Sequence, residues 1–439
     1  MFANRKSLMS KATKLAMLAI CVGNALAHSI PAAEANPVHF PQAAFSQPHE
    51  ANTFLIDFSI AIHPQAVNES LMRSTIANLG YSVREIVNYK TRYIAVITTP
   101  GGTDDVQAFR TLERYFPWVQ PNFYLTPQGS LSGVRATVSD AGSVKVGASN
   151  LAWHLGEAHV PAAWKKATGQ GIKVAVVDTG VADIPALQNS IWVRGSIDGN
   201  GVDDRDPQNH GTAVATTIAG SFSPFSSVAG VAPDCKLVSL RACDSQSRAT
   251  DLSIMKAINI SNQLGCKVVN IGFNCAAPYG LANTAVHPIT EIWFENLKRD
   301  NSLAFVPNGN DSRVGDNSGY QRNKVMVGGL GRNGRVWSFS TIGSSTTFSA
   351  PAENILCKTR NGVESKDGTS FSSAIVAGIA ALAWSARPEL NSSAMTDALR
   401  NACSPAQHTL YLGHGLPNAE RAVDNAKVIS NGTLYPAGR

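Results

Sequence analysis

The chain of 439 residues is poor in charged and aromatic side chains, which make up 15% and 7% of it. So few charges argue against a disordered chain or a coiled coil. The hydrophobic share of 44% is ordinary for a globular protein. The length is sufficient for two or three domains with sizeable cores. The composition therefore predicts a folded chain that is divided into domains.

Acidic residues are absent from the first 27 positions, which contain four basic residues. An apolar run from Leu15 to Val22 is followed by Ala25-Leu26-Ala27, a small-x-small pattern that is typical of signal-peptide cleavage sites. The alternative is a membrane anchor, but the run is shorter than the about 20 apolar residues that span a bilayer. We therefore expect residues 1–27 to be a cleaved signal peptide and the remainder to be secreted, either outside the cell or into a periplasm.

The remaining chain has almost no excess charge. Removal of residues 1–27 leaves 33 basic residues against 31 acidic ones. Binding to nucleic acid or to an anionic membrane relies on a basic excess that neutralises phosphates. We therefore expect no nucleic-acid partner, and no membrane partner after the signal is removed.

Cysteines are few, and no Cys-x-x-Cys spacing of the kind common in structural zinc sites occurs. Cys21 lies in the predicted signal peptide. The six others are Cys235, Cys243, Cys266, Cys275, Cys357 and Cys403. An even number in an exported chain predicts disulfide bonds, up to three, although the sequence does not choose among the pairings. The first four of the six lie close enough along the chain to be partners.

Two regions of different periodicity are separated by a segment rich in Gly and Ser, residues 128–149. Residues 53–127 read strand, helix, two strands, helix, strand, which is the βαββαβ order of ferredoxin-like α+β domains. Residues 150–430 contain continuous apolar runs that alternate with helical segments, which predicts an α/β domain with a buried parallel sheet. The predicted strands there are 173–177, 236–240, 267–272, 303–307 and 325–328, and residues 431–439 form a tail.

Three short motifs in a fixed order carry candidate catalytic groups. Asp178 ends a buried apolar run, His210 opens a segment of small residues, and Ser370 lies near the start of another one. Taken singly, they are equally compatible with a turn residue, a structural histidine and a helix cap. Taken together, they have the order Asp, His, Ser, one of the orders in which a nucleophilic serine, its base and its orienting acid occur.

The chain resembles secreted subtilisin-type serine proteases, the subtilases, along nearly its whole length. Beyond the three motifs, the resemblance includes residues 150–164, Gly230-Val231-Ala232-Pro233, residues 268–271 and residues 413–419. It implies that Ser370 is the nucleophile, His210 the general base and Asp178 its orienting acid. It also implies that Asn310, preceded by Gly309, donates to the oxyanion, with Asn308 as the rival candidate. Substrate would contact Gly272, Phe273 and Asn274, which depart from the usual Ser-Leu-Gly and leave the specificity open.

The resemblance further implies a subtilisin-like, three-layer α/β domain with a mainly parallel sheet. Residues 28–127 would be the propeptide, which assists folding, inhibits the enzyme from its cleft and is removed by self-processing at Pro127, Gln128 or the linker beyond. The expected product is a monomeric endopeptidase that acts on proteins or peptides and needs no cofactor for its chemistry. Two alternatives are a catalytically silent binding protein on the same fold and a peptide acyltransferase.

A loop rich in Asp, Asn and Gly suggests a structural metal site. Asp198, Asn200 and Asp203 offer oxygen ligands of the kind that calcium prefers. The loop is not a complete EF-hand, and the same residue types are favoured in solvated turns. Structural calcium is therefore one of two readings of this loop.

Overall fold

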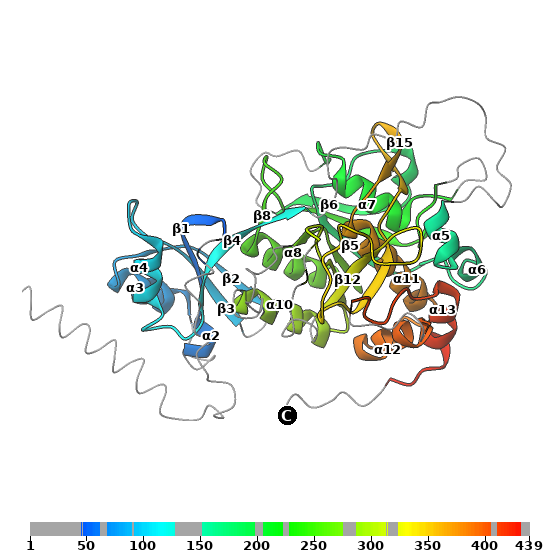
Figure 1. Ribbon diagram of the computed structural model, residues 1–439. Coiled ribbons are helices and arrows are strands. Elements are labelled where there is room, and N and C mark those ends of the chain that lie inside the picture. Colours follow the sequence, from blue (N-terminus) through cyan, green and yellow to red (C-terminus); the bar gives the residue numbers. More distant parts are fainter. Residues whose placement is uncertain are drawn as a thin grey trace, which may run out of the picture. The chain divides into compact units, whose positions relative to one another are not determined.

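The computed structural model describes residues 45, 47–61, 68–89, 92–127, 152–197, 205–222, 228–274, 287–312, 314, 324–404 and 411–431 (Figure 1). The predicted signal peptide, the linker, the candidate calcium ligands, Cys275 and residues 432–439 lie outside these ranges. The chain divides into two compact units, Met1–Tyr124 with Thr284–Thr290, and Leu125–Asn283 with Glu291–Arg439. This division falls three residues before the end that the sequence predicts for the first domain.

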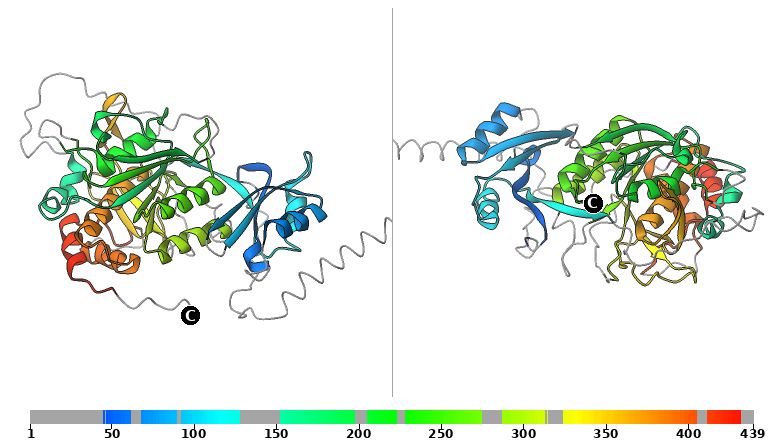
Figure 2. Two further views of the ribbon diagram at one scale, coloured as in Figure 1. Left: turned by 180° about the vertical axis from the view of Figure 1, so that it is seen from behind. Right: turned by 90° about the horizontal axis from the view of Figure 1, so that it is seen from above.

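The first unit contains the predicted βαββαβ order. Its elements are β1 (His49–Asp57), α2 (Phe58–Ala61), α3 (Glu69–Asn78), β2 (Ser82–Tyr89), β3 (Arg92–Thr98), α4 (Asp105–Leu112) and β4 (Val119–Pro127). The strands pair antiparallel in the order β4-β1-β3-β2, and α3 and α4 lie on one side of the sheet (Figures 1 and 2). Asn68 and Asp104 cap these helices by accepting hydrogen bonds from the third helical N–H. The first strand, His49–Asp57, begins four residues before the predicted start of this region at residue 53.

The second unit is built on a parallel sheet of seven strands in the order β13-β12-β11-β9-β5-β7-β6. The strands are β5 (Lys173–Asp178), β6 (Ile191–Ser196), β7 (Lys236–Arg241), β9 (Val268–Ile271), β11 (Leu303–Pro307), β12 (Val325–Leu330) and β13 (Phe348–Pro351). Five of them match the predicted apolar runs. These runs are buried on both faces, as expected for a parallel sheet between layers of helices.

Helices cover both faces of this sheet (Figure 2). On one face lie α7 (His210–Ala219) and α11 (Thr369–Ala386), and on the other α8 (Asp251–Gln263) and α10 (Pro288–Arg299). By length and composition α11 would be able to cross a membrane, but 89% of it is buried, so it is a core helix. Small residues allow this packing, since a Cβ at Gly378 would lie 2.6 Å from the Cβ of Val231. The three layers confirm the predicted fold class.

Shorter elements complete the second unit. They are α5 (Trp153–Glu157), α6 (Val160–Ala163), the 3₁₀ helix η3 (Pro185–Leu187), β8 (Ala249–Thr250), β10 (Phe273–Asn274), the hairpin β14 (Ile355–Thr359) and β15 (Gly362–Lys366), α12 (Ser392–Ala402) and α13 (Ala419–Val428). Strand β10 pairs antiparallel with the last two residues of β4, which belong to this unit, in the register Phe273 with Pro127 and Asn274 with Thr126.

The predicted disulfides are wrong for the five cysteines that the structure describes, because all five are buried free thiols. Cys235 and Cys243 lie at opposite ends of β7, whose six residues span about 20 Å at the usual rise. Cys266 precedes β9, which β5 separates from β7. Two strand spacings amount to about 9.6 Å, which exceeds the Cα separation that a disulfide bridges. Burial raises the pKa of the Cys266 thiol to about 12.

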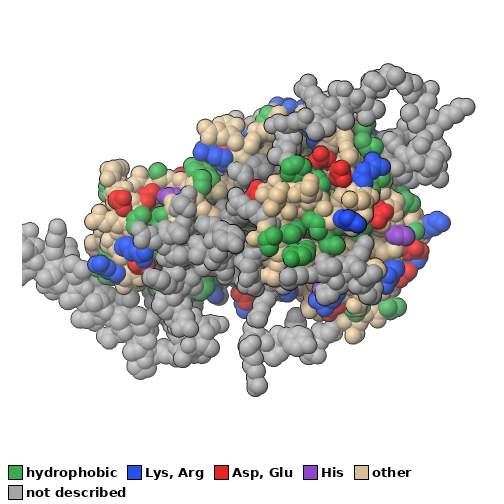
Figure 3. Space-filling model, in the orientation of Figure 1, with side chains coloured by type: hydrophobic (Ala, Val, Ile, Leu, Met, Phe, Trp, Pro, Cys, Tyr) green, Lys and Arg blue, Asp and Glu red, His purple; other side chains and the backbone are tan. Residues whose placement is uncertain are grey.

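Charged side chains of both signs are interspersed on the described surface shown in Figure 3. Charges of opposite sign also pair at the surface of the second unit: Lys166 contacts Glu420 at 2.9 Å, and Arg400 contacts Asp397 at 2.7 Å. Exposed pairs of this kind contribute about 0–1 kcal/mol each. The mixture of signs follows from the near balance of basic and acidic residues beyond residue 27.

Candidate active site

Asp178 is the last residue of β5, the strand between β7 and β9 in the sheet, and it is fully buried. Its Oδ1 lies 2.6 Å from Nδ1 of His210 and accepts a second hydrogen bond from the N–H of Thr179 at 2.7 Å. The carboxyl ends of parallel strands are the usual place for sites in α/β folds. Asp178 is thus held at that edge with its carboxylate directed at one imidazole nitrogen.

His210 and Ser370 reach this carboxylate from the first turns of two helices. His210 is the first residue of α7, and its Nε2 lies 3.2 Å from Oγ of Ser370. Ser370 is the second residue of α11, whose N-cap is Gly368, so the serine is not a capping residue. The structure therefore brings the three predicted residues into one hydrogen-bonded chain across sequence separations of 32 and 160 residues.

The imidazole of His210 lies in an electrostatically negative setting. Burial is the largest influence and lowers the pKa of His210. The charge and hydrogen bond of Asp178, with the charge of Asp206, outweigh burial and the opposing charge of Lys366. The pKa of His210 is consequently raised above its ordinary value of 6.5. The interactions that raise this pKa stabilise the imidazolium, which is the form that a histidine adopts when it takes a proton from a nucleophile.

Gly272 lies directly against the Asp178 carboxylate. A Cβ at this position would be 1.9 Å from Oδ2 of Asp178, so only glycine allows the chain just after β9 to pass this close. The resemblance assigns Gly272 to the wall of the substrate pocket, and this contact with Asp178 is a role that sequence reasoning missed. The next two residues form β10, in which Phe273 is 1% exposed.

The two candidate oxyanion donors differ in how their amides are used. The Oδ1 of Asn310 accepts from the N–H and Oγ1 of Thr369, at 3.0 and 2.9 Å, next to Ser370. Its Nδ2 has no hydrogen-bond partner among the described residues. In contrast, Nδ2 of Asn308 donates to Oγ1 of Thr346 at 2.7 Å within the core. Asn310 is therefore the asparagine whose amide nitrogen remains available beside the serine.

Comparison with known proteins identifies the family. The family model described as the subtilase family matches residues 169–425, which is more than half of the chain. The chain belongs to the subtilase family. It is thus a serine-type endopeptidase, an enzyme class that hydrolyses peptide bonds and needs no cofactor for catalysis.

Similar subtilases come from several bacteria. Subtilisin BL of Lederbergia lenta is 30% identical over 285 residues, which is 63% of this chain and 99% of the relative. M-protease of Shouchella clausii is 28% identical over 295 residues, covering 65% and 73% of the two chains. The crystal structure of MycP1 with its N-terminal propeptide removed matches with a TM-score of 0.54 and 26% identity, covering 62% of this chain and 96% of MycP1.

The described part of this subtilase contains no group of three or more His, Cys, Asp or Glu side chains that would hold a metal. The candidate calcium ligands Asp198, Asn200 and Asp203 lie outside the described residues, so calcium binding by that loop stays a prediction. Asp206, a little further along, is described and buried. Both of its carboxylate oxygens accept hydrogen bonds from threonines, and these contacts were missed by sequence reasoning.

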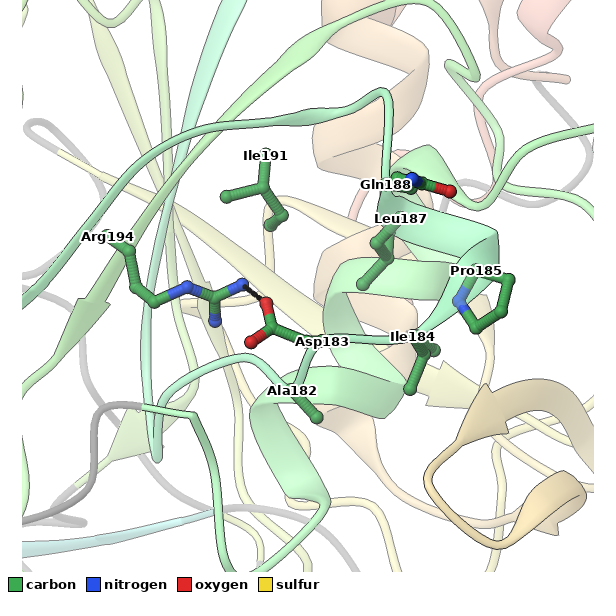
Figure 4. A pocket seen from close by; sticks show the side chains of 8 residues that line it. All are labelled: Ala182, Asp183, Ile184, Pro185, Leu187, Gln188, Ile191 and Arg194. Atoms are coloured by element: carbon green, nitrogen blue, oxygen red, sulfur yellow. Dashed lines mark hydrogen bonds and ion pairs between the residues drawn. The ribbon is translucent and has the colours of Figure 1, made fainter.

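A pocket with a volume of about 550 Å³ lies beside η3 and β6 in the second unit (Figure 4). Its walls combine apolar side chains, such as Ile184, Leu187 and Ile191, with polar ones, and Arg194 donates to Asp183 across it at 2.6 Å. None of the three triad candidates of the subtilase lines it. The pocket is therefore separate from the three candidate catalytic residues.

Proposed function

We propose that this subtilase is the zymogen of a secreted endopeptidase in which Ser370 is the nucleophile, His210 the general base and Asp178 its orienting acid. The observation that carries the proposal is the chain of hydrogen bonds from Asp178 Oδ1 through both nitrogens of His210 to Ser370 Oγ. Each distance is within hydrogen-bond reach, as proton transfer between these groups requires.

The reaction follows from this order of groups. Oγ of Ser370 attacks the peptide carbonyl while Nε2 of His210 takes the hydroxyl proton. The tetrahedral intermediate then collapses, the C–N bond breaks, and His210 returns the proton to the departing amine. Water repeats the sequence on the acyl-enzyme and releases the acid product. Asp178 keeps Nδ1 protonated and compensates the positive charge of the imidazolium in both halves.

The oxyanion of each intermediate needs donors that are in place beforehand. In this proposal Nδ2 of Asn310 and the backbone N–H of Ser370 supply them. The hydrogen bonds from Thr369 hold the other side of the Asn310 amide. Removal of one such donor typically costs about 10²–10³ in turnover, a magnitude established in this same family.

The proposal assigns residues 1–27 to the signal peptide and 28–127 to the propeptide. Residues 128–149 form the linker, residues 150–430 the peptidase domain and residues 431–439 a tail. The βαββαβ topology of the first unit and the pairing of Pro127 and Thr126 with Phe273 and Asn274 support an inhibitory propeptide whose end lies along β10. Antiparallel addition to a strand edge is also a common way to hold an extended peptide substrate.

The proposal is tested by labelling the full chain with a fluorophosphonate and measuring peptide hydrolysis and intact mass. Wild type should label on Ser370, hydrolyse peptides and lose its first 127 residues or slightly more. Ser370→Ala should do none of these. The control is Ser372→Ala. Ser372 lies in the same helix, but its hydroxyl donates to the Pro351 carbonyl of β13, so this variant should keep labelling.

Two results would overturn the proposal. A wild-type chain that folds but neither labels nor cleaves peptides would favour the silent binding protein. Products in which the acyl group is joined to an added amine, in place of the hydrolysis product, would favour the acyltransferase, and product mass distinguishes them.

A further inference from the structure

Asp206 is a fully buried carboxylate that lies outside the proposed triad. Three donors converge on it. Oγ1 of Thr179 donates to Oδ1 at 2.7 Å, and the N–H and Oγ1 of Thr212 donate to Oδ2 at 2.7 and 2.5 Å. A buried charge is tolerated when it is hydrogen-bonded in this way. The cost of placing a carboxylate here suggests that it serves the neighbouring residues.

The partners of Asp206 belong to the two elements that carry Asp178 and His210. Thr179 directly follows Asp178, and its Oγ1 also accepts from the N–H of Gly211 at 2.9 Å. Thr212 is the third residue of α7. Asp206 therefore joins the end of β5 to the first turn of the helix that begins with His210.

Asp206 also takes over the capping of α7. The N-cap residue, Asn209, has a left-handed φ of 61° and makes no side-chain capping hydrogen bond. The N–H of Thr212, which a cap side chain normally satisfies, donates to Asp206 instead. A negative charge is favourable at this end of a helix. The first turn of α7 is thus fixed by a carboxylate that comes from outside the helix.

The charged groups around His210 come from several elements. Asp178 on β5 and Asp206 before α7 favour the imidazolium, and Lys366 on β15 opposes it. Arg241 on β7 donates to the Thr179 carbonyl at 2.7 Å and to Gln208 at 3.1 Å, beside the same network. Asp206 is therefore the second of two acids that act on the imidazole.

We propose that Asp206 is a positioning residue of the endopeptidase: it holds His210 in register with Asp178 and supplies a second negative charge that stabilises the imidazolium. The inference rests on the proposed role of His210 as general base. It adds a fourth side chain to the proposed triad, one that touches neither substrate nor Ser370.

The test compares pH profiles of kcat and kcat/KM for Asp206→Asn and Asp206→Glu. Loss of the charge should move the acid limb of kcat/KM to lower pH by about 0.5 unit. Loss of the geometry should lower kcat about 10-fold to 100-fold with little change in KM. Asp206→Glu should keep the acid limb, since it keeps the charge. Asp183→Asn, which removes an exposed carboxylate paired with Arg194, is the control and should change neither quantity.

Thr179→Val separates the two parts of the inference and serves if Asp206→Asn does not fold. It removes the hydrogen bond to Asp206 but leaves both charges, so kcat should fall while the acid limb stays. An unchanged kcat in Thr179→Val, or an unchanged acid limb in folded Asp206→Asn, would overturn the inference. Full activity in His210→Ala would instead contradict the proposed function itself, and this result can be told apart from the outcomes for Thr179→Val and Asp206→Asn.

Discussion

The contact between Gly272 and Asp178 gives the sharpest prediction. In Gly272→Ala the new Cβ would lie 1.9 Å from Oδ2 of Asp178, about 1.5 Å short of ordinary contact. Asp178 is fully buried and its Oδ1 is held by His210 and Thr179, so its carboxylate moves only at the expense of these hydrogen bonds. Either the carboxylate or the chain at position 272 must shift by about that distance, and a shift of the carboxylate would break its 2.6 Å hydrogen bond to the imidazole.

A misplacement of about 1 Å in a catalytic group costs about 10²-fold in rate, equivalent to about 2.7 kcal/mol of barrier. We therefore expect kcat of Gly272→Ala to fall at least 100-fold, measured with a chromogenic peptide and with the active fraction titrated by a fluorophosphonate. The control is Gly156→Ala, since a Cβ there meets nothing within 4 Å. A kcat within threefold of wild type would refute the reasoning. A raised KM with kcat retained would instead assign Gly272 mainly to substrate binding.

Four further outcomes follow from the site and the core. Because the pKa of His210 is raised, kcat/KM should decline toward acid with an apparent pKa above 6.5, as a pH profile would measure. Asn310→Ala should lower kcat about 10²–10³-fold, whereas Asn308→Ala should mainly lower the melting temperature. Buried His154 has its pKa lowered to about 3 by burial, so stability is lost as pH falls below 6.5. His154→Leu in a Ser370→Ala background should remove about 2 kcal/mol of the stability difference between pH 7 and pH 5 in urea unfolding. The five buried thiols should react with a thiol reagent only after unfolding, and a reductant should leave the melting temperature unchanged.

The sequence predicted the five strands whose buried residues form continuous apolar runs. It missed β6 and β13, for different reasons. β6 is an edge strand with a half-exposed surface, including Trp192 at 47% exposure, so its pattern is not a hydrophobic run. β13 is fully buried but is only four residues long and contains Ser349 and Pro351. Local periodicity carries too little information in both cases.

The candidate site shows the same division between local and non-local information. Asp178, His210 and Ser370 were identified from their order, because each lies in a motif with a local signature. The contacts of Gly272 and Asp206 had no such signature, since they depend on which segments meet in space. The disulfide prediction failed for a related reason. An even cysteine count shows only that every thiol could find a partner in an oxidising compartment. In the fold, β5 and the length of β7 keep Cys235, Cys243 and Cys266 apart.

Two helix N-termini meet at the proposed catalytic centre, and they place opposite demands on it. The partial positive charge at the start of α11 favours the oxyanion that forms beside Ser370. The same charge at the start of α7 disfavours an imidazolium at His210, the first residue of that helix. A single orienting acid would have to offset both this charge and the burial of the ring. Asp206 accepts a hydrogen bond from the N–H of Thr212 in that same first turn, so its charge lowers the positive potential at the start of α7. Asp178 meanwhile orients the imidazole through its hydrogen bond to Nδ1. This arrangement of two helices therefore requires a second carboxylate, Asp206, if His210 is to act as the base while Ser370 carries the acyl group.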